Sequence, residues 1–208
     1  MLGLLGKKLG MTQLFDDAGE RVSVTVIKAG PCVIARRKTI AADGYDAVAV
    51  GFEPATKEKK ITKPIAGLYK KAGVKPHKFL KEFRPQKYDG LDVGKDITVA
   101  LFKKGDFVDV SGMTKGRGFQ GVIKRCGKSG GPAAHGSKFH RTTGSVGMRT
   151  WPGRVLPGTG MAGQMGNVKR TIKRLKVVNI DADKNLLFVE GAVPGARNGL
   201  VVVSSKTL

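Results

Sequence analysis

Two glycine-rich stretches in the middle of the chain have spacings that resemble nucleotide-binding loops. Gly116 to Gly121 match G-x-G-x-x-G, a pattern that sets a pyrophosphate on a helix N-terminus and needs an acid about 20 positions later for the ribose. The next acid is Asp181, and later glycines forbid a long helix. Gly127-Lys128-Ser129 resembles the end of a P-loop, but Val122 occupies the position of the required earlier glycine. We therefore expect these glycines to let the backbone lie against a phosphate or sugar edge without a Cβ clash.

Histidine and cysteine side chains in the same region could suggest a metal site or a nucleophile. His135, His140 and Cys126 have no carboxylate near them in sequence to complete a zinc site. The same lack of acids excludes a Ser–His–Asp triad or a pair of catalytic carboxylates within this region. We expect both imidazoles to hydrogen-bond to an external partner or to stack on it, and we expect no metal, no cofactor and no catalytic residue.

The lack of acids extends much further along the chain. From Val110 to Ile180, roughly 71 residues hold 14 Lys or Arg and 15 Gly but no Asp or Glu. A segment this cationic and this poor in aliphatic runs cannot fold around its own core. Its charge requires a long external anion, and a folded RNA with crevices suits it better than a flat duplex.

The overall composition agrees with a polyanionic partner. The 208 residues carry a net charge of +22 with a pI near 10.3. Outside the acid-free stretch, 24 basic and 16 acidic side chains leave an excess of only 8. A soluble basic surface alone would have interspersed acids, and a membrane-surface role would need an amphipathic basic helix that Gly and Pro interrupt here.

The sequence gives little support for a membrane-spanning, secreted or disulfide-bonded protein. No window has ~18 consecutive apolar residues, which a membrane-spanning helix would need. The first charges follow the N-terminal apolar residues, the reverse of a secretory signal. Cys32 and Cys126 are far apart, which argues against a disulfide framework. We expect a cytoplasmic protein.

Basic and aromatic residues recur through the acid-free stretch and its return. Arg and Lys neutralise phosphates, while Phe, His and Trp stack on unstacked bases. Trp151 has no apolar neighbours in sequence to bury it, so we expect it to dock into a partner. For Lys173 and Lys176, the polar face of a strand explains the charge equally well. The predicted RNA-binding residues are Lys115, Arg117, Gly118, Phe119, Lys124, Arg125, Lys128, His135, Lys138, Phe139, His140, Arg141, Arg149, Trp151, Arg154, Lys169 and Arg170.

Strand patterns flank the acid-free stretch on both sides. Strict alternation at 21–26 predicts that Val22, Val24 and Val26 share one buried face. Alternation at 97–101, a turn, and a second apolar run at 107–110 predict a hairpin. Further strands are predicted at 32–36, 47–52, 175–180, 186–189 and 200–203. Short strands with regular turns indicate a mainly β fold built on a small closed barrel.

Two segments interrupt these strands. The first, 57–88, is rich in Lys and Pro and is predicted to hold a short helix from Ile65 to Ala72 that stops at Gly73. The second is the acid-free stretch, and so long a loop inside a compact domain is usually functional or disordered. We predict a β-barrel domain formed by 1–110 and 168–208, with a small helical or irregular insertion at about 55–90. Residues 111–167 are predicted to form a long, mostly irregular basic extension.

Short motifs lie along the whole chain. The first is GLLGKKLGMT at 3–12, and the next is TKGRGFQG at 114–121. Others lie at 135–137, 144–147, 152–155, 161–166 and 191–196. Each motif alone is weak, but together, and in this order, they are highly specific and resemble the ribosomal protein L3 family of the bacterial large subunit.

The resemblance carries expectations about fold and function. It implies a six-stranded barrel of the kind shared with translation factors, and an extension that threads through rRNA toward the peptidyl-transferase centre. It also implies binding near the 3′ end of the large-subunit rRNA, a part in nucleating subunit assembly, and the neighbours L14 and L19. By position, 115–121 is the root of the extension. The implied tip consists of Gly147, Met148, Arg149, Thr150, Trp151 and Pro152.

One feature of the tip departs from the family pattern. Some bacterial members carry a glutamine there that is methylated on its side-chain amide, whereas this chain reads Met148-Arg149-Thr150.

The sequence therefore predicts a non-catalytic, rRNA-binding structural protein of the large ribosomal subunit that is not an isolated homo-oligomer. Two alternatives belong to other classes. A general RNA chaperone or nucleic-acid-compacting protein would bind many sequences with similar affinity, and an enzyme using the glycine-rich loop would be stabilised by ATP or NAD.

Overall fold

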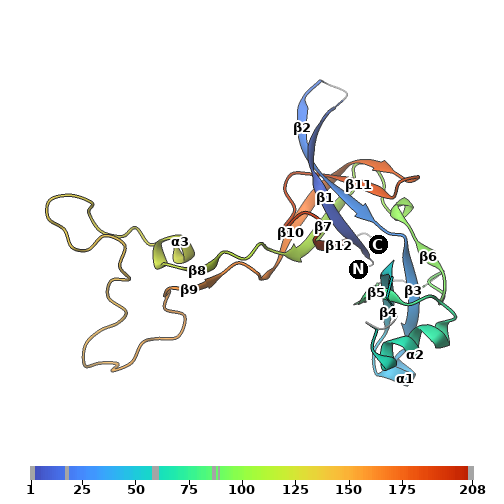
Figure 1. Cartoon of the computed structure of the whole chain (residues 1–208), viewed down its shortest axis with the longest axis horizontal. Helices are drawn as coiled ribbons and strands as arrows, with labels where there is room; N and C mark the ends of the chain where they lie inside the picture. The colour runs from blue at the N-terminus through green and yellow to red at the C-terminus, as the bar shows by residue number, and fades with distance from the viewer. Residues whose placement is uncertain (1–2, 17–18, 58–60, 86–87, 89, 206–208) are drawn as a thin grey trace. The chain divides into compact units, whose positions relative to one another are not determined.

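The computed structural model describes residues 3–16, 19–57, 61–85, 88 and 90–205. The chain divides into two compact units. Unit 1 comprises Met1–Met113 and Lys169–Leu208, and unit 2 comprises Thr114–Val168. Most elements are strands, so the predicted mainly β class is confirmed (Figure 1). No helix in the described ranges is long and apolar enough to cross a membrane.

Six strands of unit 1 pair with one another, all antiparallel, in the closed order β1-β12-β7-β10-β11-β2. β1 contacts both neighbours because its first half pairs with β12 and nearly its whole length pairs with β2. These strands are β1 (Gly3–Phe15), β2 (Arg21–Ala29), β7 (Phe107–Met113), β10 (Lys169–Asp181), β11 (Leu186–Glu190) and β12 (Leu200–Ser204).

A second sheet of four strands completes unit 1, in the order β5-β4-β3-β6. The predicted helix is confirmed as α2 (Lys63–Ala72), with Pro64 in its first turn and Gly73 at its end. The other elements here are β3 (Cys32–Lys38), α1 (Ile40–Asp43), β4 (Ala47–Pro54), β5 (His77–Phe83), β6 (Asp96–Ile97) and the 3-10 helix η2 (Val99–Leu101).

One hydrophobic core serves both sheets of unit 1. Leu4, Leu5 and Leu187 of the barrel strands are fully buried in the same cluster as Ile34 and Val50 of the second sheet. Burying a side chain of this size stabilises the fold by about 1.5–3 kcal/mol. This shared core makes the second sheet an integral part of the unit.

The structure corrects two expectations about strands. The predicted hairpin of 97–101 with 107–110 does not form, because β6 ends at Ile97 and pairs with β3, while β7 pairs with β10 and β12. Val22 and Val26 are only half-buried, whereas Thr25 is fully buried and donates its hydroxyl to the Gly191 carbonyl at 2.6 Å. Residues on both faces of β2 are therefore buried.

Candidate nucleic-acid interface

Unit 2 begins and ends on a short ladder. β8 (Gly118–Gln120) pairs antiparallel with β9 (Gly163–Met165), and the Arg117 N–H donates to the Met165 carbonyl at 2.8 Å. Figure 1 shows the two strands side by side, with long irregular loops beyond them. The ladder uses only backbone groups, so the Phe119 side chain, 75% exposed, remains available to a partner.

A single turn of helix, α3 (Val122–Cys126), follows the ladder. Val122 is the one fully buried hydrophobic residue of unit 2, all of whose residues are described. The Arg125 guanidinium donates to the Met161 carbonyl at 2.6 Å and to the Gln164 carbonyl at 3.2 Å. Arg125, although predicted to bind RNA, thus ties α3 to the returning chain with part of its donor set.

The chain crosses itself closely beyond α3. The Gly131 N–H donates to the His140 carbonyl at 2.9 Å, and a Cβ on Gly131 would lie 1.8 Å from the Phe139 carbonyl oxygen. Only glycine fits at this crossing. Nδ1 of His140 lies 2.9 Å from the Pro132 carbonyl oxygen, so Nδ1 carries the proton and Nε2 is the nitrogen left for another partner.

The predicted tip is an open loop around a shallow hollow of about 450 Å³. Trp151 is 82% exposed and Met148 is 75% exposed. The Ser145 hydroxyl donates to the Gly147 carbonyl at 2.8 Å, which supports one side of the loop. Both side chains are therefore accessible to a partner.

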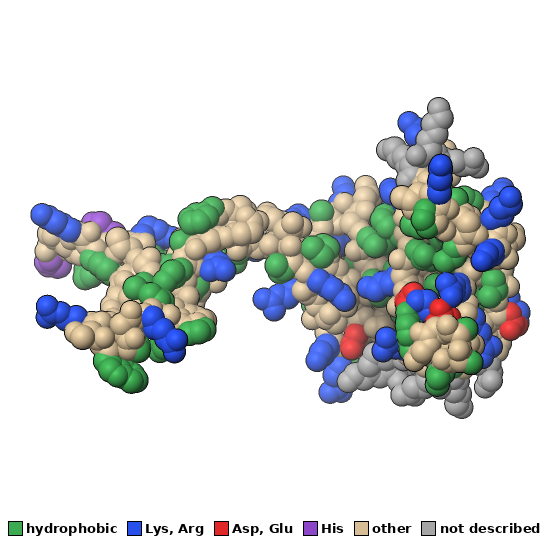
Figure 2. Space-filling view, turned by 90° about the horizontal axis from the view of Figure 1, so that it is seen from below, with side chains coloured by type: hydrophobic (Ala, Val, Ile, Leu, Met, Phe, Trp, Pro, Cys, Tyr) green, Lys and Arg blue, Asp and Glu red, His purple; other side chains and the backbone are tan. Residues whose placement is uncertain are grey.

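The cations of unit 2 lack internal counter-ions. All five ion pairs found among the described residues lie in unit 1. Figure 2 shows basic and hydrophobic side chains on unit 2 with no acidic ones. Lys128 is half-buried and donates to the Thr143 carbonyl at 3.3 Å. The other predicted contacts in unit 2 are exposed, namely Lys115, Arg117, Gly118, Phe119, Lys124, Arg125, His135, Lys138, Phe139, His140, Arg141, Arg149, Trp151 and Arg154.

Two predicted contacts belong to unit 1. Lys169 and Arg170 are exposed on β10, where they pair with Met113 and Gly112 of β7. Both therefore lie on a strand of the six-stranded sheet, outside the predicted bounds of the extension. Arg174 on the same strand lies over the Phe107 ring at 5.7 Å.

The candidate metal ligands of unit 2 do not form a cluster. His135 is exposed. The thiol of Cys126 donates a hydrogen bond to the Met161 carbonyl oxygen, which lies 3.6 Å from Sγ. Within the described ranges, no group of three or more His, Cys, Asp or Glu side chains is arranged to hold a metal ion.

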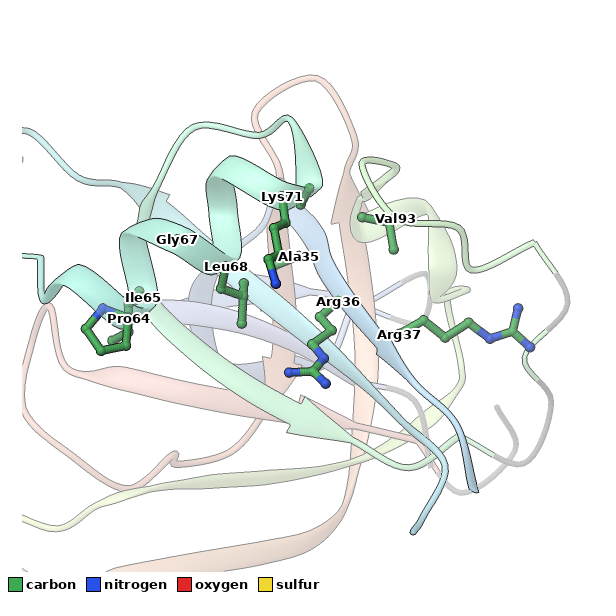
Figure 3. Close-up of a pocket in the computed structure, with 10 residues that line it drawn as sticks. Ala35, Arg36, Arg37, Pro64, Ile65, Gly67, Leu68, Lys71 and Val93 are labelled. Carbon is green, nitrogen blue, oxygen red and sulfur yellow. The ribbon is translucent and has the colours of Figure 1, made fainter. Parts of the chain in front are cut away.

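Sequence reasoning missed a second basic surface, in unit 1. A groove of about 750 Å³ lies between α2 and β3 (Figure 3). Leu68 and Lys71 point from α2 toward β3, where Arg36 and Arg37 leave the strand in different directions. The consecutive basic residues at the end of β3 are a signal that could have indicated it.

The chain is similar in sequence to known ribosomal proteins. Residues 92–186 match the family model described as ribosomal protein L3. The chain is 52% identical to the large ribosomal subunit protein uL3 of Fervidobacterium nodosum over 202 residues, which is 97% of each chain. It is 52% identical to that of Thermotoga maritima, over 97% of this chain and 96% of the relative, and 48% identical to that of Brachyspira hyodysenteriae, over 99% and 94%. The chain therefore belongs to the ribosomal protein L3 family.

Proposed function

We propose that the chain is a structural constituent of the large ribosomal subunit that binds rRNA through unit 2. The observation that carries the proposal is the physical character of Thr114–Val168, which has nine basic side chains, no acid and one buried hydrophobic residue. Basic side chains replace counter-ions where phosphates crowd together. The role is structural, and the site of action is the large ribosomal subunit in the cytoplasm.

The exposed aromatic side chains add a second kind of contact, which is the stacking of bases on their rings. Phe119, Phe139 and Trp151 present ring faces on which unstacked bases can lie. Close crossings such as the one at Gly131 let the backbone fit narrow gaps in folded RNA. Lys169 and Arg170 of β10 add phosphate contacts from unit 1.

The more specific parts of the proposal come from the resemblance to the family. We propose that the chain binds near the 3′ end of the large-subunit rRNA, helps to nucleate subunit assembly, and directs residues 147–152 toward the peptidyl-transferase centre. On this proposal the barrel is of the translation-factor kind, and L14 and L19 are its neighbours.

The test is the selectivity and the salt dependence of RNA binding. We expect the full chain to select large-subunit rRNA from total RNA, with log K falling against log salt at a slope of several units, because each phosphate contact contributes about 0.7–0.9. A slope near zero would overturn the phosphate-neutralising mechanism. Equal affinity for all RNA would favour a general RNA chaperone, and stabilisation by ATP or NAD would favour an enzyme.

A further inference from the structure

A cavity of about 380 Å³ in unit 1 is lined by residues of β1, β2 and all four strands of the second sheet. This volume lies within the range of small-ligand sites. Pro31, Val33, Phe52 and Pro54 supply apolar walls. Phe52 is nearly buried and stacks on Phe79 with ring centroids 6.5 Å apart, so its ring is held in place. Flat, fixed apolar walls suit a planar ring.

Two polar atoms of residues that line the cavity are buried and have no hydrogen-bond partner in the described chain. They are Oε2 of Glu53 and Nδ1 of His77, whose residue is 9% exposed. Nζ of Lys7 donates to the other oxygen of Glu53 at 2.5 Å, while Nζ of Lys78 lies 3.7 Å from Oε2, beyond hydrogen-bond reach. Buried polar atoms rarely lack a hydrogen bond in native proteins, so Nδ1 of His77, and Oε2 of Glu53 beside its ion pair with Lys78, are the atoms that an external partner would satisfy.

The backbone at Glu53 supports this inference. Its φ of 59° lies in the left-handed region, where residues other than glycine are strained. Such strain is concentrated at ligand sites, because the surrounding structure must hold it in place. The hydrogen bond from Lys7 lowers the pKa of Glu53, so the carboxylate is ionised and only accepts. Burial lowers the pKa of His77, so its ring is neutral near pH 7.

The charges around the cavity define the ligand further. Lys7, Lys28, Glu53 and Asp96 line the cavity, and their formal charges cancel, while Lys78 is ion-paired with Glu53 from outside the lining. A lining of mixed sign gives neither a phosphate nor an arginine side chain a net attraction, and it favours a neutral ligand with hydrogen-bonding edges. Lys28 on β2 is exposed and can meet a phosphate outside the cavity.

We propose that this cavity binds a nucleobase with an exocyclic amino group, extruded from the rRNA, whose N–H donates to Glu53 while its phosphate lies beside Lys28. Adenine, cytosine and guanine present such an amino group, whereas the N3–H of uracil lies between two carbonyl oxygens that a carboxylate repels. The inference that the base comes from rRNA rests on the proposed function, whereas the inference that the cavity binds a base does not.

Titration of the full chain with AMP, CMP, GMP and UMP tests the cavity itself. We expect saturable changes of the amide resonances of Phe52, Glu53 and His77 at millimolar AMP, CMP or GMP, and weaker changes with UMP. Glu53→Gln and His77→Phe should each weaken binding about tenfold, and His77→Phe keeps a ring against Tyr69. Glu82→Gln is the matched control, because Glu82 also pairs with a lysine, at 2.7 Å, but does not line the cavity.

Binding of rRNA to the same variants tests the source of the base. We expect Glu53→Gln and His77→Phe to weaken rRNA binding about tenfold and Glu82→Gln to leave it unchanged. Nucleotide binding with unaltered rRNA affinity would assign the cavity to a free nucleotide and overturn the extruded base. No response to any nucleotide, or a response only to arginine amide, would overturn the proposal as a whole. If the wild-type chain does not select rRNA, the proposed function fails, and the nucleotide titration alone decides the cavity.

Discussion

Unit 1 and unit 2 balance charge and fill space in different ways. Among the described residues, unit 1 holds a continuous apolar core and all five ion pairs, while unit 2 buries only Val122 fully and contains no acid. A region with its own core can offset the entropy cost of ordering, about 1–2 kcal/mol per residue for the backbone. A region without one must obtain that free energy from a partner. The difference teaches that the stabilising contacts of this chain are concentrated in unit 1.

Amide exchange on the free chain is expected to show the largest contrast between the units. Core amides such as those of Leu187 and Val110 should exchange only on global unfolding, which for ordinary domains costs about 5–15 kcal/mol. Amides near Trp151 should exchange with little protection, because that loop has no ladder. Strong protection there without RNA would contradict the comparison.

Truncating the core should affect only unit 1. Leu187→Ala is expected to lower the free energy of unfolding by about 2–5 kcal/mol, because Leu187 is fully buried. Urea denaturation followed by circular dichroism measures the change. Val122→Ala is the matched variant in unit 2 and should leave the urea midpoint of unit 1 unaltered. Equal effects of the two variants would show that the units unfold as one.

Removing the tip indole should weaken rRNA binding without affecting stability. Trp151→Ala is expected to cost about 1–3 kcal/mol of binding free energy, the range for loss of one base stack. Filter binding to large-subunit rRNA measures it. Phe15→Ala is the control, because Phe15 is also a highly exposed aromatic but belongs to unit 1. A larger loss for Phe15→Ala would place the main RNA contact on the barrel.

The two cysteines should report the smallest difference between the units. Burial raises the pKa of Cys32 to about 12, and its Sγ lies 3.4 Å from the Leu5 carbonyl, whereas Cys126 is exposed. A thiol reagent at pH 8 should modify Cys126 in the native chain and reach Cys32 only after unfolding. Mass spectrometry counts the adducts, and two adducts on the native chain would contradict this.

The pKa of Cys32 also sets a pH dependence. The pKa of the folded state lies above the unfolded value of about 8.5. The free energy that this neutral thiol contributes is therefore fully present below about pH 8.5 and declines as the pH rises toward 12. Cys32→Ala should remove this part of the alkaline destabilisation in urea titrations at increasing pH.

Local patterns predicted the elements whose signals lie within a few neighbouring residues. Helix α2 has Pro64 at its start and Gly73 at its end, and both positions follow from backbone chemistry alone. β1 was missed because its glycines and the pair Lys7-Lys8 break the alternation that marks a strand. The hairpin at 97–110 was wrong because alternation shows which residues are extended but not which strand they pair with.

The same limit applies to the candidate site. Trp151 was predicted to dock into a partner because its sequence neighbours offer little to bury it. Its side chain is 82% exposed, and the docking itself stays a prediction. The internal hydrogen bonds of Arg125 could not be predicted, because their acceptors are 36 and 39 positions away. The cavity beside Glu53 could not be predicted either, because its lining residues are spread along the sequence from Lys7 to Asp96.

The absence of acids from unit 2 has a consequence for the lifetime of unassembled copies. Proteases that cleave after lysine or arginine find exposed sites such as Lys138, Arg141 and Arg149 along irregular backbone. Bound RNA would cover these sites, so digestion would spare assembled copies and remove surplus ones. The charge that recruits the partner would then also limit how long a copy persists without it.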